Sequence, residues 1–337
     1  MGKGLVLFCR DIVFRLLPVI VLTAGFGCSS VPLSCEPVHR SLRVVNPSGR
    51  AVRLMRVGGG SVDLGRAHRV DLELEADRYV LDDGIMEYPV PLLADVIAKD
   101  QPLTVVLGDR VSAPEGFIYV PGGPALVGDV LGVGAPDERP ARVVDVAPFL
   151  LAARETTNAE FVAFLNAMGR CDEIWIDLGG PKCRIERDEG GRFRTDAPDE
   201  PVVTVSLPGA LAYCSWLTRD TGIVHRLPTE VEWEKAARGP SSSTYSYGDV
   251  YTAEAANQES GVLMPVAHFP AAGWGFFDLT GNAFEWTSSE YAPGLQVLRG
   301  GSFVLDGPYL RNSFRMWYRP VVQADDMGFR VLREIQE

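Results

Sequence analysis

A side-chain amide and a carboxylate stand three residues apart at Asn282 and Glu285. Together with the backbone carbonyls between them, they supply the hard oxygen ligands that Ca²⁺ prefers. The spacing therefore predicts a calcium site in this segment. The alternative is that Glu285 forms a buried pair with an arginine and binds no metal.

Residues 226–239 hold a denser set of charges, three glutamates among three cationic side chains. A structural helix accounts for them better than an active site does. Thr229 and Glu232 form a capping box, and Gly239 is suited to the C-terminal end of a helix. The glutamates fall early in this stretch and Lys235 falls late, as the helix dipole favours. We therefore expect a short helix that serves the scaffold.

The chain has few residues that could form a nucleophilic catalytic triad or a metal site built from histidines. A Ser-His-Asp triad needs a histidine, and the sequence holds four. His225 and His268 lie in the second half of the chain, where no Gly-x-Ser-x-Gly elbow accompanies them. Their spacing does not suit a histidine metal site either. We expect both to be structural.

Two further helices are expected to position these segments. Thr157 and Glu160 form a capping box before a periodic apolar face. Another helix is predicted from about Pro208 to Thr218, with Gly222 as its stop. After residue 239 the chain reads as loop and short strand, which predicts an α+β fold with low regular content.

Residues 41–112 show a different pattern of short strands and turns. Val70, Leu72 and Leu74 alternate with acidic residues, which is typical of a half-buried strand. Residues 103–107 predict another strand. We expect a small antiparallel β-sandwich that acts as a spacer, with a ligand-binding module as the alternative.

Four blocks, at residues 226–239, 281–287, 299–303 and 328–330, occur in an order that resembles the formylglycine-generating enzyme, or sulfatase-modifying factor, family. An opening block ends at Gly128. The resemblance implies a domain over residues 113–337 with a variant of the C-type lectin-like fold. In that fold, long irregular segments are held by buried polar contacts and bound calcium.

The resemblance also implies two calcium sites. In the first, the ligands are the counterparts of Asn282, the backbone near Ala283, and Glu285. The second begins at Asn257 and Gln258. The aspartate that usually completes it has no counterpart downstream here, so the second site is not expected to be complete.

The oxidase members of the family carry two cysteines after a Gly-Gly-Ser sequence. The two thiolates bind copper(I), a soft metal that suits sulfur, and convert a cysteine of a sulfatase to formylglycine. Counting on from Ser302 leads here to Leu305 and Leu310, and the last cysteine of the chain is Cys214. We therefore expect no copper and no oxidase reaction. The iron-dependent sulfoxide synthases of the family use histidines that have no counterpart here.

The resemblance still implies a substrate groove, although the copper ligands are missing. Aromatic residues and arginines contribute strongly to binding, and they are frequent in this part of the sequence. The alternative is that the arginines, Arg315 and Arg330 above all, form internal salt bridges. The predicted groove consists of Ser302, Leu305, Asp306, Tyr309, Leu310, Arg311, Trp317, Tyr318 and Arg319.

Residues 1–28 have the pattern of a signal peptide. An apolar run at residues 16–22 is too short to span a bilayer comfortably, and small residues precede Cys28. Cys28 is the predicted lipidation site of a bacterial lipoprotein, with an ordinary secretory signal as the alternative, and a tether follows at 29–40. In an oxidising compartment Cys171 and Cys183 either pair or remain thiols.

Composition narrows the choice of partner. A net charge of -12 argues against nucleic acid, whose binding requires a basic face. We expect an exported protein, anchored to the membrane of the cell envelope, that binds a peptide, protein or glycan and lacks oxidase activity. The alternatives are a divergent envelope enzyme or maturation factor with an unidentified cofactor, and a purely structural component of the envelope.

Overall fold

A computed structural model describes residues 37–98 and 101–336 of the chain. Residues Pro37–Glu337 form one compact unit. The predicted signal peptide, its Cys28 and most of the predicted tether lie outside the described residues. Within the described ranges, the structure has no helix that is long and apolar enough to cross a membrane.

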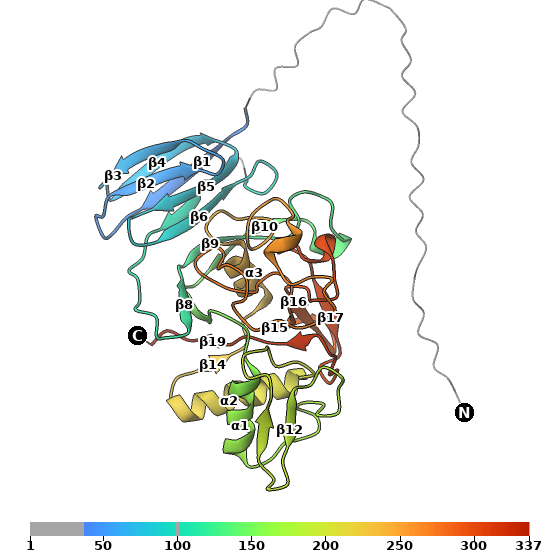
Figure 1. Ribbon diagram of the computed structural model, residues 1–337. Helices are drawn as coiled ribbons and strands as arrows, with labels where there is room; N and C mark the ends of the chain where they lie inside the picture. Colours follow the sequence, from blue (N-terminus) through green and yellow to red (C-terminus); the bar gives the residue numbers. More distant parts are fainter. Residues whose placement is uncertain (1–36, 99–100, 337) are drawn as a thin grey trace, which may run out of the picture. The chain divides into compact units, whose positions relative to one another are not determined.

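The first part of the described chain is a β-sandwich, drawn in blue to teal in Figure 1. One sheet has the strand order β4-β1-β7 and the other the order β3-β2-β5-β6. Alternation places Leu42, Val44 and Leu54 in the core. The strands are β1 (His39–Val45), β2 (Val52–Arg56), β3 (Ser61–Gly65), β4 (Arg69–Glu75), β5 (Asp77–Asp82), β6 (Glu87–Leu92) and β7 (Leu103–Val106).

The predicted small β-sandwich is confirmed, with one difference in its strand directions. The β1 and β7 strands run parallel, with Leu42 opposite Leu103, whereas the other pairs of the sandwich are antiparallel. A parallel pair needs a long connection. Sequence alternation reports which face of a strand is buried and carries no information on strand direction.

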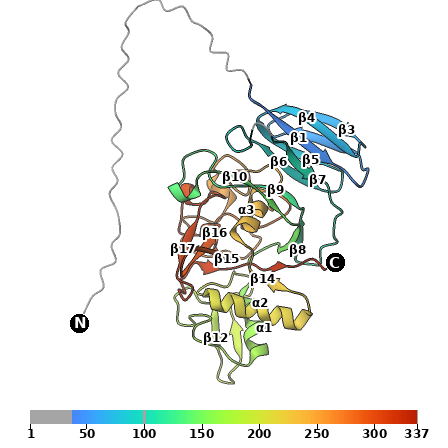
Figure 2. The same cartoon turned by 180° about the vertical axis from the view of Figure 1, so that it is seen from behind.

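The sandwich shares its apolar core with the rest of the chain. Tyr119 and Leu150, from the second part, belong to the same buried cluster as Leu42 and the other core residues of the sandwich. Polar contacts add to this: Arg78 donates to both carboxylate oxygens of Asp249 at 2.9 and 2.6 Å. Figures 1 and 2 show β6 and β9 side by side from opposite directions.

The second part combines small sheets with long irregular segments. Two four-stranded sheets have the orders β14-β19-β11-β8 and β17-β16-β15-β18, and β9–β10 and β12–β13 are paired strands. These strands are β8 (Phe117–Val120), β9 (Gly123–Val127), β10 (Arg142–Val146), β11 (Phe149–Ala152), β12 (Ile185–Arg187), β13 (Phe193–Thr195), β14 (His225–Arg226), β15 (Phe284–Ala292), β16 (Leu295–Arg299), β17 (Met316–Tyr318), β18 (Met327–Gly328) and β19 (Leu332–Arg333). Short 3₁₀ helices are η1 (Pro136–Glu138), η2 (Ala253–Ala255) and η3 (Gly307–Tyr309).

The three predicted helices are confirmed, as are their capping residues. The α1 helix (Asn158–Met168) is capped by Thr157, and α3 (Glu230–Arg238) by Thr229, each with a reciprocal contact from a glutamate three residues on. The α2 helix (Leu207–Thr221) runs three residues beyond the expected end and stops at Gly222, which adopts a left-handed conformation. Together with the β-rich remainder, this is the predicted α+β fold with low regular content.

Buried charges connect the four sequence blocks to one another. Glu285 of β15 accepts hydrogen bonds at 2.7 Å from the Arg330 Nε and Nη2 atoms and from the Trp233 Nε1 atom. In α3, Glu234 binds both Arg238 and Arg299. Both clusters are shielded from water, so each charge depends on its partner. These residues come from every one of the four blocks, which explains why the blocks occur together.

One buried cation lacks an ionic partner of this kind. Lys235 of α3 is 2% exposed and donates to the Gly123 carbonyl at 2.8 Å. Burial lowers the pKa of Lys235 to about 7, whereas a lysine in an unfolded chain has a pKa of about 10.4. Above pH 7 the unfolded state therefore binds more protons than the folded state at this residue.

We predict that Lys235 makes the protein more stable as the pH rises from 6 to 8. The slope of the unfolding free energy from this residue approaches about 1.4 kcal/mol per pH unit. The unfolding free energy of the native protein, measured with urea, should rise relative to that of a Lys235→Met variant as the pH increases across this range. A constant difference would contradict the prediction. Burial raises the pKa of the Cys171 and Cys214 thiols, but both proteins contain these thiols, so their titration cancels from the difference.

Candidate functional site

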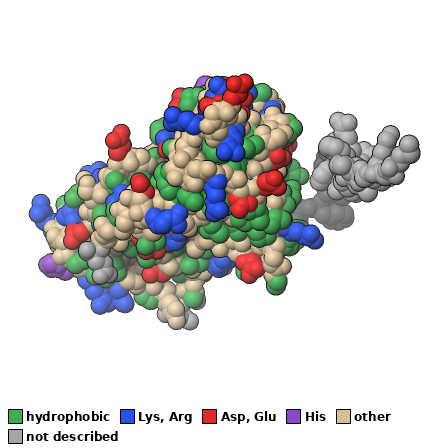
Figure 3. All heavy atoms as spheres, turned by 90° about the horizontal axis from the view of Figure 1, so that it is seen from below, with side chains coloured by type: hydrophobic (Ala, Val, Ile, Leu, Met, Phe, Trp, Pro, Cys, Tyr) green, Lys and Arg blue, Asp and Glu red, His purple; other side chains and the backbone are tan. Residues whose placement is uncertain are grey.

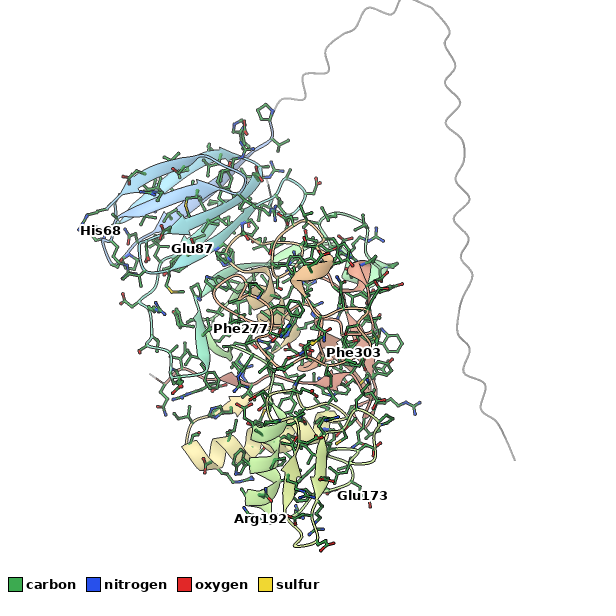
Figure 4. All side chains as sticks on the ribbon, viewed as in Figure 1. His68, Glu87, Glu173, Arg192, Phe277 and Phe303 are labelled. Atoms are coloured by element: carbon green, nitrogen blue, oxygen red, sulfur yellow. The ribbon has the colours of Figure 1, made fainter. Side chains whose placement is uncertain are left out.

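The predicted calcium segment lies at the start of β15, and its carboxylate is already paired. Glu285 is fully buried and forms an ion pair with Arg330 at 2.7 Å. The arginine completes its donors on the Ala152 and Phe277 carbonyls; Phe277 is labelled in Figure 4. This arrangement matches the alternative raised from the sequence, in which Glu285 pairs with an arginine. Calcium could bind to this carboxylate only after the pair with Arg330 had broken.

The amide of Asn282 is engaged in the same way. Its Oδ1 atom accepts hydrogen bonds from Asn257 Nδ2 at 2.8 Å and from the Met264 backbone at 3.1 Å. Its Nδ2 group donates to Glu155 at 2.8 Å, and Glu155 also accepts from the Ala283 backbone at 3.1 Å. The structure therefore brings the two predicted calcium segments, at Asn257 and Asn282, into direct contact through amide hydrogen bonds.

The remaining residue of the second calcium segment is also engaged. The Gln258 Oε1 atom accepts from the Tyr251 hydroxyl at 2.8 Å. Within residues 37–98 and 101–336, no group of three or more His, Cys, Asp or Glu side chains is placed to hold a metal ion. The side-chain oxygens predicted as ligands are thus used by protein donors, and they do not fit a calcium ion in this arrangement. Calcium binding stays a prediction for solution measurement.

We expect the stability of this chain to be independent of calcium. Arg330 already neutralises Glu285, so removing calcium leaves no buried carboxylate without a partner there. The thermal unfolding midpoint should agree within about 1 °C in excess EGTA and in millimolar CaCl₂. A calcium-dependent increase of several degrees would show that the ion binds the folded state and would contradict this expectation.

The segment that would hold the copper thiolates is filled by packing. Leu310 is 1% exposed, and a Cβ atom added at Gly301 would collide with its Cδ2 atom. Leu305 is partly buried and packs against the main apolar core. Ser302 is fully buried and donates to Asp326 at 2.8 Å. Phe303, labelled in Figure 4, lies next to this serine and is itself buried.

Three residues of the predicted groove are therefore not at the surface. Ser302 and Leu310 are buried as described, and Arg311 is 7% exposed because it binds Glu138 at 3.1 Å and lies 3.8 Å from Asp129. The groove prediction is corrected for these three. The sequence pattern located the segment, but it could not separate side chains that face the core from those that face water.

The aromatic residues of the predicted groove are exposed. Trp317 and Tyr318 of β17 are 42% and 39% exposed, and Tyr309 is 49% exposed. The Trp317 ring stacks on Tyr291 with centroids 5.2 Å apart, and the Arg315 guanidinium lies 5.0 Å above the other ring of that pair, Tyr291. We call Tyr291 and Trp317 the aromatic surface; Tyr318 follows Trp317 in the same strand and so points to the other face of the sheet. Arg319 is exposed beside it, whereas Leu305 and Asp306 are only partly exposed.

Arg315 and Arg330 form internal salt bridges, as the structural alternative predicted. Arg315 binds Glu230 through two nitrogens, at 2.9 and 3.1 Å, and Arg330 is fully buried. Sequence reasoning missed two residues at this site, Glu155 and Tyr291. Burial raises the pKa of Glu155 well above its ordinary value, with Asp278 and Glu285 adding to the effect. No spacing in the sequence marks Glu155, whose partners lie more than a hundred positions away.

Cys171, Cys183 and His225 have structural surroundings, whereas His268 is exposed. Cys171 and Cys183 are both free thiols, packed against the main apolar core, so the pair left open by the sequence does not form a disulfide here. Burial raises the pKa of the Cys171 thiol to about 11, which keeps it protonated. His225 is buried, with its Nδ1 atom 2.8 Å from the Ile223 carbonyl.

Comparison with known proteins agrees with the blocks and the fold. Residues 104–335 match the family described as "Sulfatase-modifying factor enzyme 1-like domain". The chain is similar to a formylglycine-generating enzyme of Streptomyces coelicolor, 29% identical over 66% of this chain and 90% of the relative. It is also similar to a mouse protein named inactive C-alpha-formylglycine-generating enzyme 2, with 31% identity over 64% and 84% of the two chains.

A further relative and two solved structures extend the comparison. A hercynine oxygenase of Mycolicibacterium thermoresistibile is 32% identical over 68% of this chain but only 63% of its own length. The structure of PvdO from Pseudomonas aeruginosa superposes with a TM-score of 0.54 and 25% identity, covering 65% of this chain and 94% of that one. CarF superposes with a TM-score of 0.53 and 23% identity over 67% of this chain and all of CarF, and this shows likeness of fold.

The family match covers more than half of the chain, and it includes all four sequence blocks. The chain therefore belongs to the sulfatase-modifying factor family. Its relatives include formylglycine-generating enzymes, a protein named inactive, and hercynine oxygenases. Membership thus establishes the scaffold and leaves the reaction open.

Proposed function

We propose that this chain is an exported, lipid-anchored protein of the bacterial cell envelope whose sulfatase-modifying-factor-like domain binds a peptide, protein or glycan partner. We further propose that it does not carry out copper-dependent oxidation of cysteine. The proposal depends chiefly on one observation, the presence of Leu305 and Leu310 at the two positions where the family resemblance places the catalytic cysteines.

Leucine cannot replace the chemistry of those cysteines. A hydrocarbon side chain donates no electron pair to a soft metal and exchanges with no thiol. The burial of Leu310 against Gly301 supports the proposal further, because this position now contributes to packing. The mouse relative named inactive shows that the same scaffold occurs in a protein described as lacking the activity.

The aromatic surface supports a binding role. Stacked and exposed Trp and Tyr side chains are enriched at protein interfaces, since they bury a large apolar area and keep a polar edge. Arg319 adds a cationic donor at the same place. On the face seen in Figure 3, charged side chains of both signs are interspersed, an arrangement that does not favour a polyanion such as nucleic acid.

A divergent enzyme with another cofactor is the second candidate. The hercynine oxygenases among the relatives favour it, because they show that proteins with this domain are named for other reactions. Metal analysis of the purified protein separates the two functions. Stoichiometric iron or copper would support the enzyme, and purified protein that contains neither metal would support the binding role.

The oxidase part of the proposal is tested with a sulfatase-derived peptide that contains cysteine. We expect this protein to produce no formylglycine in the presence of copper(I) and oxygen, as measured by mass spectrometry of the peptide. The similar Streptomyces coelicolor enzyme serves as the positive control. Formylglycine above the level of a protein-free reaction would refute this part of the proposal.

The binding and anchoring parts need separate experiments. We expect a Trp317→Ala variant to lose envelope partners that the native protein captures from membranes, whereas Val250→Ala, which is 77% exposed elsewhere, should retain them. Equal capture by both variants would exclude the aromatic surface as the binding site.

We expect a Cys28→Ala variant to lose incorporation of labelled palmitate. Incorporation that persists in this variant would exclude lipidation at Cys28.

A further inference from the structure

A cavity of about 250 Å³ lies apart from the copper segment and the aromatic surface. It is bounded by the sheet β14-β19-β11-β8 and by helices α1 and α2. Phe117, Leu217 and Val331 provide apolar walls, and polar side chains reach it from several elements. We call it the Arg333 pocket. Its volume is just below the range of about 300–1,000 Å³ that holds drug-sized ligands, so its ligand must be small.

Arg333 brings a positive charge to this pocket without a protein partner. The residue lies directly opposite His225 in the antiparallel pair of β14 and β19, so both side chains leave the same face of the sheet. In the described part of the chain, the Arg333 Nε atom is buried and has no hydrogen-bond partner, whereas the terminal nitrogens are not among the buried atoms without partners. The terminal nitrogens are therefore the donors that an anion in the cavity can reach.

The acidic side chains around the pocket do not supply that acceptor. Glu160 binds the other arginine of the pocket, Arg154, at 2.9 Å through a forked pair. The carboxylate of Glu155 accepts from Asn282 and the Ala283 backbone, as described above. Glu115 is exposed, and no ion pair links it to Arg333 in the described ranges. The charge of Arg333 is therefore free to bind an anion.

A second donor belongs to the lining of the pocket. Tyr213 of α2 is 5% exposed and brings its hydroxyl-bearing ring to this lining. The His225 Nδ1 atom is close to the Ile223 carbonyl, which leaves the Nε2 atom of the ring without a protein partner among the described residues. A guanidinium without an ion pair in the described ranges and a phenol thus line one small cavity with apolar walls.

We propose that the Arg333 pocket binds a small monocarboxylate with an apolar body. A guanidinium presents parallel N–H donors that match a carboxylate, and the carboxylate supplies a countercharge to Arg333. The apolar body packs against Phe117, Leu217 and Val331. This binding is independent of the partner proposed for the aromatic surface, and either can fail without affecting the other.

Benzoate is the probe, and benzyl alcohol is the uncharged analogue of similar shape. In titrations of the whole purified protein followed by ligand-observed NMR, we expect benzoate to bind and benzyl alcohol to bind at least tenfold more weakly. We expect Arg333→Gln to weaken benzoate binding about tenfold or more, as befits the loss of a charge-assisted hydrogen bond. Tyr213→Phe should weaken it severalfold.

Arg219→Gln is the matched control, since Arg219 is exposed on α2 and is not part of the pocket lining. We expect it to bind benzoate as the native protein does. Thermal unfolding of each variant checks that it is folded, and Tyr213→Phe keeps the ring and its packing. Absence of benzoate binding to the native protein would overturn the proposal. Equal affinity of native protein, Arg333→Gln and Tyr213→Phe would overturn it as well.

Discussion

An Arg330→Met variant should lose about 3–5 kcal/mol of unfolding free energy, the typical cost of removing one partner of a buried ion pair. Both side chains of the Arg330–Glu285 pair are 0% exposed. The substitution leaves the Glu285 carboxylate without its countercharge, and the Trp233 indole is then its one remaining donor among the described residues. Arg330 also supplies donors to the Ala152 and Phe277 carbonyls, so these acceptors lose their partner at the same time.

Three variants separate the charge from the packing. Glu285→Leu/Arg330→Met removes both charges, and we expect it to be clearly more stable than Arg330→Met alone, because no unpaired ion remains. Arg194→Met is the control for loss of an arginine: its pair with Glu186 is more than 60% exposed on both sides, so the change should stay below about 1 kcal/mol. Guanidinium unfolding measures all of them. A double variant as unstable as Arg330→Met would show that shape, rather than charge, dominates at this position.

The same ion pair explains why the fold could be recognised from the sequence and the metal site could not. Glu285 and Arg330 fall in separate blocks, so the blocks identify the scaffold reliably. A carboxylate beside an amide has the same sequence pattern whether it holds calcium or a buried arginine. Only the placement of Arg330, 45 positions away, distinguishes the two.

Local physics accounts for the parts that were predicted well. The caps at Thr157 and Thr229 depend on residues three positions apart, so their hydrogen bonds can be inferred from short stretches. Contacts between distant segments could not be inferred. Examples are the parallel pairing of β1 with β7, the shared core around Tyr119, and the contact of Glu155 with Asn282. Each of them depends on chain topology, which hydrophobic patterning does not encode.

Truncation of Leu310 tests whether this residue, at a position where the family resemblance places a cysteine, belongs to the core. Leu310 is 1% exposed and lies against Gly301, whose left-handed backbone conformation allows this close approach. We expect Leu310→Ala to lower the unfolding free energy by about 2–5 kcal/mol, the usual range for a buried leucine. Leu305→Ala should cost less, because Leu305 is only partly buried.

Leu211→Ala is the matched control, an identical truncation at a residue that is 43% exposed on α2. We expect it to change the unfolding free energy by less than about 0.5 kcal/mol. If Leu310→Ala were as mild as this control, Leu310 would border open space, and the argument that its side chain fills this position would fail. If the large loss is observed, Leu310 is part of the packed scaffold. A metal ion at this position would then need room that the Leu310 side chain fills.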